Sequence, residues 1–146
     1  MSIKGILSEG FLDGGNNTPF SVDWRHLTED EQDLILSFLK EINIQEDVIG
    51  KNKESWLTDQ RQKIPLTDGY EAECYWHYHS GPTWDHNSFR NRTRCLVFNP
   101  GGKASPECIH YYPVSSDEII IVGFSRDHIP FIPSDVPNNP FFSQSD

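Results

Sequence analysis

The spacing of apolar residues changes along the chain, and this change restricts the fold more than any other feature. Between residues 28 and 43 apolar side chains recur three and four positions apart, at Leu34, Ile35, Phe38, Leu39 and Ile42. From residue 69 onward, apolar and polar residues alternate with a period of two. Helical spacing indicates an amphipathic helix, whereas alternation indicates strands with two different faces. A helix followed by strands predicts an α+β domain.

The start of the helix is marked by a capping box. Thr28 is followed three residues later by Glu31, and acidic residues fill the first turn. Such a pair satisfies backbone N–H groups at a helix N-terminus, so we predict a helix over 28–43. A weaker helix or an irregular segment is predicted in EDVIGKNKESWLTDQRQK (46–63), interrupted by Gly50 and ended by Pro65.

The second half of the chain predicts a four-stranded antiparallel sheet. Turn signals such as Gly81-Pro82 separate the apolar segments, and short polar connections between neighbouring strands favour an antiparallel meander. The predicted strands span 70–79, 93–99, 107–114 and 118–125. The last is almost continuously apolar, which is typical of a central strand. A further short strand is possible over 3–7, and the helix is expected to pack on one face of the sheet.

Length and charge limit the organisation of the protein. The 146 residues suit one domain, which we place at 1–128, followed by a proline-rich extended tail at 129–146. The net charge of −10 argues against broad nonspecific binding to nucleic acid, which requires a basic surface. No segment resembles a signal peptide or a membrane span, so we expect a cytoplasmic protein that does not contact membranes.

The three cysteines favour the same compartment. Cys74, Cys95 and Cys108 form no CxxC motif, and their number is odd. Each stands in an apolar segment with the character of a strand. They are therefore predicted to be buried free thiols in a reducing environment rather than a disulfide framework.

The segment YWHYHSGPTWDH (75–86) contains the residues best suited to chemistry. In the predicted strand 70–79, alternation assigns Trp76 and Tyr78 to the core face. The opposite face is predicted to be polar and exposed, and it carries Tyr75, His77 and His79.

Two histidines side by side allow several interpretations. They are suited to acid–base catalysis near neutral pH, to metal binding, or to hydrogen bonding in a ligand cleft. A polar face without chemistry is equally open. A catalytic zinc needs three protein ligands, so a third would have to come from Asp85, His86, His110 or His128. For His110 a packed or hydrogen-bonded role is favoured.

Phosphodiester cleavage without a metal requires further groups. A cation must stabilise the charge that develops on phosphorus, and Arg92, Arg94 and Arg126 are available for this purpose. Aromatic rings stack on bases, and Tyr75 and Trp84 are the rings that alternation leaves outside the core.

The order of segments resembles a known toxin family. LTEDEQDLILSFL, VIGKNKESW, CYWHYH, RTRCLVFN and IIIVGFSRDH follow one another over residues 27–128. This order is similar to the RelE/ParE superfamily of bacterial toxins, and most similar to the YafO-type mRNA interferases. The resemblance implies a RelE-like fold and an endoribonuclease that cleaves mRNA on the ribosome without a cofactor, held inactive by a cognate antitoxin.

The resemblance also implies roles for individual residues. His77 or His79 would act as the general base, and His128 as the acid. Arg94 and Arg126 would stabilise the phosphate charge. Independently of the resemblance, Tyr75, Trp84 and Arg92 are the residues we expect to bind the substrate.

The strong negative charge keeps two other classes of function open. An acidic domain could be an immunity or antitoxin-like protein that binds a basic partner, because carboxylates steer such an encounter. Glu71 and Glu73 are predicted to lie beside His77 and His79, which suits such a surface. The other class is a metal-binding domain with histidine ligands.

Overall fold

The protein is represented by a computed structural model, which describes residues 3–18, 21–44, 48, 50–80, 96, 98–100 and 105–126. Over these residues helices and strands are mixed, which confirms the α+β class. The elements in chain order are β1 (Lys4–Leu7), α1 (Glu9–Asp13), the 3-10 turn η1 (Trp24–His26), α2 (Glu29–Asn43), β2 (Asn52–Glu54), α3 (Asp68–Ala72), β3 (Trp76–His79), β4 (Cys108–Ser115) and β5 (Glu118–Ser125).

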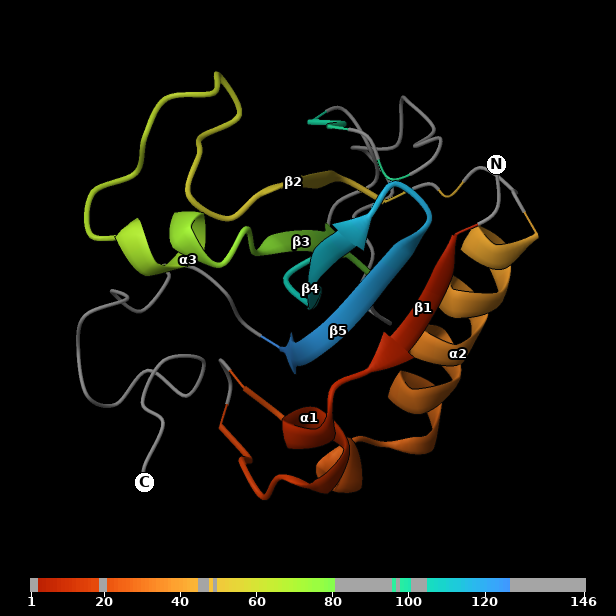
Figure 1. Ribbon diagram of the computed structural model, residues 1–146. Helices are drawn as coiled ribbons and strands as arrows, with labels where there is room; N and C mark the ends of the chain where they lie inside the picture. The colour runs from red at the N-terminus through yellow and green to blue at the C-terminus, as the bar shows by residue number, and fades with distance from the viewer. Residues whose placement is uncertain are drawn as a thin grey trace.

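The strands form one five-stranded sheet in the order β1-β5-β4-β3-β2 (Figure 1). β3, β4 and β5 are joined in antiparallel fashion, and β2 pairs antiparallel with β3. The predicted meander would place the strand 93–99 between 70–79 and 107–114, but β3 pairs directly with β4. β1 runs parallel to β5, with Ile6 opposite Ile120. The prediction of four antiparallel strands is therefore wrong in number and in the direction of one edge strand. β1 and β5 are far apart in sequence, so no local pattern in either segment specifies their pairing.

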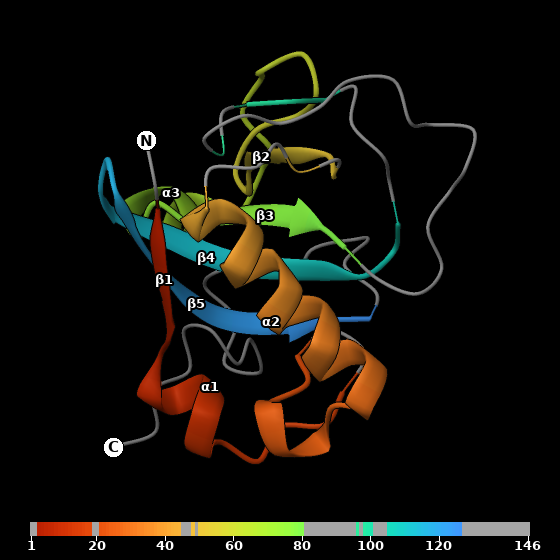
Figure 2. The same cartoon turned by 90° about the vertical axis from the view of Figure 1, so that its right-hand side faces the viewer.

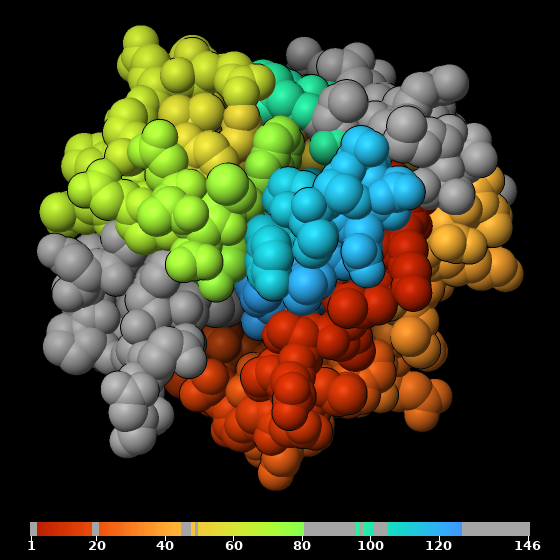
Figure 3. Space-filling model, in the orientation of Figure 1, coloured from red at the N-terminus to blue at the C-terminus, as the bar shows by residue number. Residues whose placement is uncertain are grey.

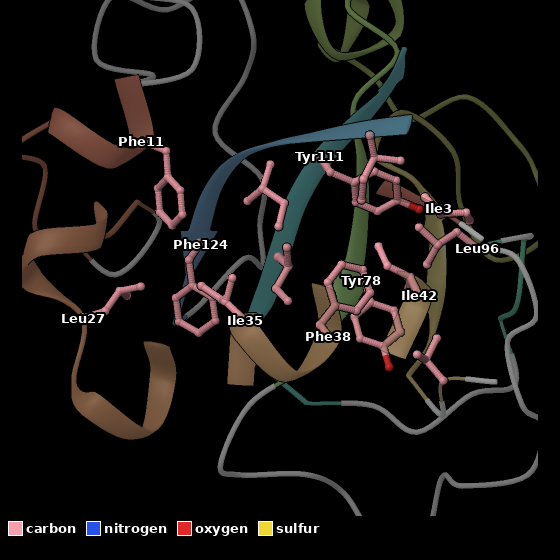
Figure 4. Close-up of a cluster of buried hydrophobic side chains, with 14 of the residues drawn as sticks. Ile3, Phe11, Leu27, Ile35, Phe38, Ile42, Tyr78, Leu96, Tyr111 and Phe124 are labelled. Atoms are coloured by element: carbon pink, nitrogen blue, oxygen red, sulfur yellow. The ribbon is translucent and has the colours of Figure 1, made fainter. Parts of the chain in front are cut away.

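α2 covers one face of this sheet (Figure 2). The predicted capping box is present, because Thr28 Oγ1 accepts from the N–H of Glu31 at 3.2 Å and Glu31 accepts from the N–H of Thr28 at 2.9 Å. Ile35, Phe38 and Ile42 are buried, as their spacing predicts. The core forms where these side chains meet the sheet (Figure 4).

The chain before β3 is helical where a strand was predicted. α3 occupies Asp68–Ala72, Cys74 has a positive φ of 57°, and the strand begins only at Trp76. Cys74 is also exposed, so the prediction of a buried thiol is wrong for this residue. Alternation over five or six residues does not separate a strand from a short helical turn, which explains the error.

The weaker helix predicted over 46–63 is not present in the described part of that segment, which holds β2 instead. Asn52 is fully buried there and connects three parts of the chain. Its side chain accepts from Tyr111 Oη at 2.8 Å and donates to the Leu96 carbonyl at 2.9 Å. Its backbone forms an isolated bridge with Asn99. These tertiary hydrogen bonds favour an extended chain over local helix propensity.

Some predictions concern residues outside the described part. The strand 93–99 is described only at its positions 96, 98 and 99, and the tail 129–146 is not described. Among the described helices, none has the length and apolar character needed to cross a membrane. On the surface, the region of α3 and β3 borders the β4–β5 hairpin (Figure 3).

Candidate metal centre

β3 places His77 and His79 on the face of the sheet opposite α2. Tyr78, which stands between them, stacks on Phe38 of α2 with ring centroids 4.6 Å apart. Successive side chains of a strand point to opposite faces, so the two histidines share the other face, as predicted. The predicted exposure is wrong, because His77 is 1% and His79 is 4% exposed.

β4 adds two further side chains to this face. His110 lies directly opposite His77, and Cys108 directly opposite His79. Side chains of directly opposed residues project to the same side of a sheet. Both are buried, with Cys108 0% and His110 1% exposed. We call these four residues, two on each strand, the histidine cluster.

Three members of the histidine cluster are close enough to share one metal ion. Each of His77, His79 and Cys108 offers one ligand atom, and these three atoms lie within 4.8 Å of one another. The ring centroids of the two histidines are 5.2 Å apart. Imidazole nitrogen with thiolate sulfur is the donor set of zinc and related transition metals, whereas magnesium and calcium prefer oxygen.

Hydrogen bonds orient the two histidines of β3. His79 Nδ1 lies 2.6 Å from the carbonyl oxygen of Ser105. A carbonyl only accepts, so Nδ1 carries the proton and neutral His79 has its lone pair on Nε2. His77 Nδ1 lies 3.1 Å from the hydroxyl of Ser55. Hydrogen bonds of this kind from the second ring nitrogen are typical of metal-bound histidines.

Cys108 is a neutral thiol in the metal-free protein. Its complete burial raises the pKa of the thiol well above the ordinary value, and the charge of the adjacent Glu107 raises it further. Lys51 and Lys53 act in the opposite direction and lower this pKa. A metal that binds here would therefore displace the thiol proton.

The two lysines border the cluster, Lys53 within β2 and Lys51 just before it. Lys53 is paired with His77 in the register, and the carbonyl of Lys51 accepts from the N–H of His79. Both ammonium groups bind the Asp59 carboxylate at 2.8 Å. The charges of Lys51 and Lys53 favour a thiolate at Cys108, while the charge of Glu107 opposes it.

Arg126 does not join the histidine cluster. Its guanidinium forms a bidentate ion pair with Glu31, at 2.8 and 2.9 Å, and donates to the carbonyl of His26 at 3.3 Å. Burial opposes ionisation of Glu31, but its bonds to Arg126 and Thr28 outweigh this and lower its pKa. Since Glu31 belongs to α2, Arg126 connects the end of β5 to the face of the sheet away from the histidines.

Tyr75 belongs to an aromatic group next to β3. Its ring lies 6.4 Å from that of Tyr70 and 6.0 Å from that of Tyr112, and the side chain is half-buried. Burial, and then the charge of Glu73, raise the pKa of Tyr75 to about 12, so the phenol stays protonated at neutral pH. The ring is engaged by other rings, and this leaves only part of its surface for a base.

Several predicted site residues lie outside the described part of the chain. Arg92, Arg94 and His128 belong to this group, as do Trp84 and the alternative ligands Asp85 and His86, together with Cys95. The described neighbours of the cluster also differ from expectation. Glu71 belongs to α3 and binds Lys63 at 2.9 Å, and Glu73 caps that helix, so these carboxylates do not extend the histidine strand.

Cys108 is the candidate ligand that was not predicted from the sequence. The signal for it is a second pair at strand spacing, Cys108-Ile109-His110, in the strand that follows His77-Tyr78-His79. Two such pairs on neighbouring strands can bring four donors together, but only if the register places them opposite each other. His110 itself fulfils its predicted hydrogen-bonded role, since its Nε2 lies 2.8 Å from Ser125 Oγ.

Comparison of the chain with models of known families, with curated proteins and with solved structures returns no match.

Proposed function

We propose that this protein binds a zinc-class metal ion through His77, His79 and Cys108. The observation that carries the proposal is the convergence of one ligand atom from each residue within 4.8 Å, in a buried part of the sheet. A tetrahedral zinc site, with Zn–N of about 2.0 Å and Zn–S of about 2.3 Å, needs ligand atoms about 3.3 to 3.6 Å apart. A contraction of about 1 Å would complete the arrangement.

The strands support this proposal by holding the ligands in place. His77 and His79 are separated by one residue on β3, and Cys108 is fixed opposite His79 by the ladder. Ligands on strands need little reorganisation on binding, which favours affinity. The carbonyl of Ser105 leaves Nε2 of His79 as the donor nitrogen.

The side chains of His77, His79 and Cys108 supply the donor atoms that a zinc-class ion prefers, two imidazoles and a thiol. Imidazoles and a thiol occupy a layer where apolar side chains would pack without the cost of burying polar groups. Buried polar groups of this kind are found where they are hydrogen-bonded or coordinate metals. The proposal gives all three side chains a common role.

Metal analysis of untagged protein tests the proposal. We expect one equivalent of zinc per chain after dialysis against a metal buffer, and its loss in His79→Ala and Cys108→Ala. His26→Ala and Cys74→Ser are the matched controls, because both residues are exposed. They should bind as the unaltered chain does. Retention of zinc by the Cys108→Ala variant, or substoichiometric metal in the unaltered chain, would contradict the proposal.

An endoribonuclease of the RelE type is the second candidate function. The observation in its favour is the pairing of two imidazoles, His77 and His79, with ring centroids 5.2 Å apart and with Nδ1 of each held by a hydrogen bond. Such a pair could give and take a proton in phosphodiester cleavage.

Expression of variants distinguishes the two functions. The nuclease hypothesis predicts slowed growth and cleaved mRNA on expression of the unaltered chain, and normal growth with the His77→Ala/His79→Ala double variant. It also predicts that Cys108→Ala remains toxic, since the thiol has no role in that chemistry. Intact mRNA and equal growth in all strains would exclude this candidate.

A further inference from the structure

The histidine cluster contains four side chains, one more than the proposed metal site uses. We infer that His110 is the fourth ligand, coordinating through Nδ1, and that the site is a closed centre of three histidines and one cysteine. This inference rests on the proposed function and adds the residue that completes it. It also assigns the metal a structural role.

The register of the sheet places His110 for this role. His110 is opposite His77 and Cys108 is opposite His79, so the four residues form two facing pairs on one side of the sheet. The His110 ring centroid lies 6.2 Å from that of His77. A closed tetrahedral site needs four donors from a rigid frame, and two antiparallel strands supply them in pairs.

Hydrogen bonds determine which nitrogen each ring would use. His77 and His79 have Nδ1 held by Ser55 and by the Ser105 carbonyl, so Nε2 is their donor atom. In His110 the other ring nitrogen takes part in the hydrogen bond, because Ser125 Oγ lies 2.8 Å from Nε2. Its Nδ1 is then the donor, and all three of these donor nitrogens are buried.

Coordination by His110 requires a movement of its ring. It lies outside the group of ligand atoms within 4.8 Å, so coordination requires its ring to turn toward Cys108. Its neighbour on the other side is Gly123 of β5, which has no side chain to restrict that movement. The register of the β4–β5 ladder also shifts between His110 and Tyr111, so the pairing is irregular next to this residue.

The burial of the histidine cluster favours a site with four protein ligands over a site with one free coordination position. All four residues are at most 4% exposed. A catalytic metal keeps one position for water or substrate, whereas a structural zinc is surrounded by four protein ligands. The ion would therefore join β3 to β4 rather than present a reactive water.

Cobalt substitution and zinc competition test the fourth ligand. We expect His110→Ala to weaken zinc binding about 100-fold or more, because even supporting partners of ligands are worth about 10 to 100-fold. The visible spectrum of the cobalt form should change as water replaces nitrogen, and added imidazole should restore it. Ser125→Ala should weaken binding less than His110→Ala, and His26→Ala should have no effect.

A measurement on the unaltered chain covers the case in which His110→Ala fails to fold. In cadmium-113-loaded, nitrogen-15-labelled protein, three histidine rings should show coupling to the metal, with His110 coupled through Nδ1. Coupling to two rings only, or zinc affinity and a cobalt spectrum unchanged by His110→Ala, would overturn the inference and leave the three-residue site intact. Absence of metal binding by the unaltered chain would instead overturn the proposed function, and the inference with it.

Discussion

Removal of the metal is expected to lower the thermal unfolding midpoint of this protein by about 12 °C. Zinc that binds only the folded chain stabilises it by about 4 kcal/mol when the free metal is 1,000 times its dissociation constant. For a chain of this length, each kcal/mol corresponds to about 3 °C in the midpoint. The effect should be concentrated in β3 and β4, because the proposed ligands His77, His79 and Cys108 belong to these strands.

Calorimetry with and without a chelator measures this effect. The Cys108→Ala variant provides the matched control, since it lacks the thiolate and should show the same midpoint in both conditions. Cys74→Ser retains the three ligands and should respond to the chelator as the unaltered chain does. A midpoint of the unaltered chain that is insensitive to chelation would contradict a stabilising metal.

The second large effect is expected from Phe38→Ala, which should reduce the free energy of unfolding by about 3 to 5 kcal/mol. Phe38 is 2% exposed and stacks on Tyr78, so its removal leaves a cavity between α2 and β3 (Figure 4). A loss of this size is a large fraction of the stability of a small domain. Urea denaturation followed by tryptophan fluorescence would measure it.

Leu36→Ala is the control for this prediction. Leu36 belongs to the same helix but is 51% exposed, so its truncation should change the stability by less than about 0.5 kcal/mol. Equal losses for the two variants would mean that α2 does not pack on the sheet through Phe38. Zinc binding provides a second readout, because the histidine cluster lies on the opposite face and should still be occupied in folded Phe38→Ala protein.

The sequence pattern predicted a helix or strand correctly where the residues within that element determine its conformation. The helix predicted over 28–43 is observed at Glu29–Asn43, because its capping box and apolar stripe act within a few turns. The strand predicted over 118–125 is observed with the same bounds, because a continuous apolar segment suits an inner strand. Segments with weaker patterns, such as 46–63 and 70–75, were wrongly assigned, since their conformation depends on contacts with the rest of the chain.

The candidate site was also predicted only in part: features that depend on one strand were predicted correctly, and features that depend on contacts between elements were not. Alternation correctly placed His77 and His79 together on the face away from Tyr78, because this depends only on the geometry of a strand. It wrongly left that face exposed, and it did not connect the histidines to Cys108. Arg126 was expected near the histidines, yet its ion pair with Glu31 depends on the packing of α2 against the end of β5.

The sequence by itself therefore determined the α+β class, the long helix, the last two strands and the shared face of two histidines. Only the tertiary structure decided that β1 pairs with β5, that the histidine face is buried, and that Cys108 and His110 lie opposite His79 and His77. The physical reason is the separation along the chain between the residues that interact. Periodicity acts between neighbours along the chain, whereas register and burial depend on residues that meet only after folding.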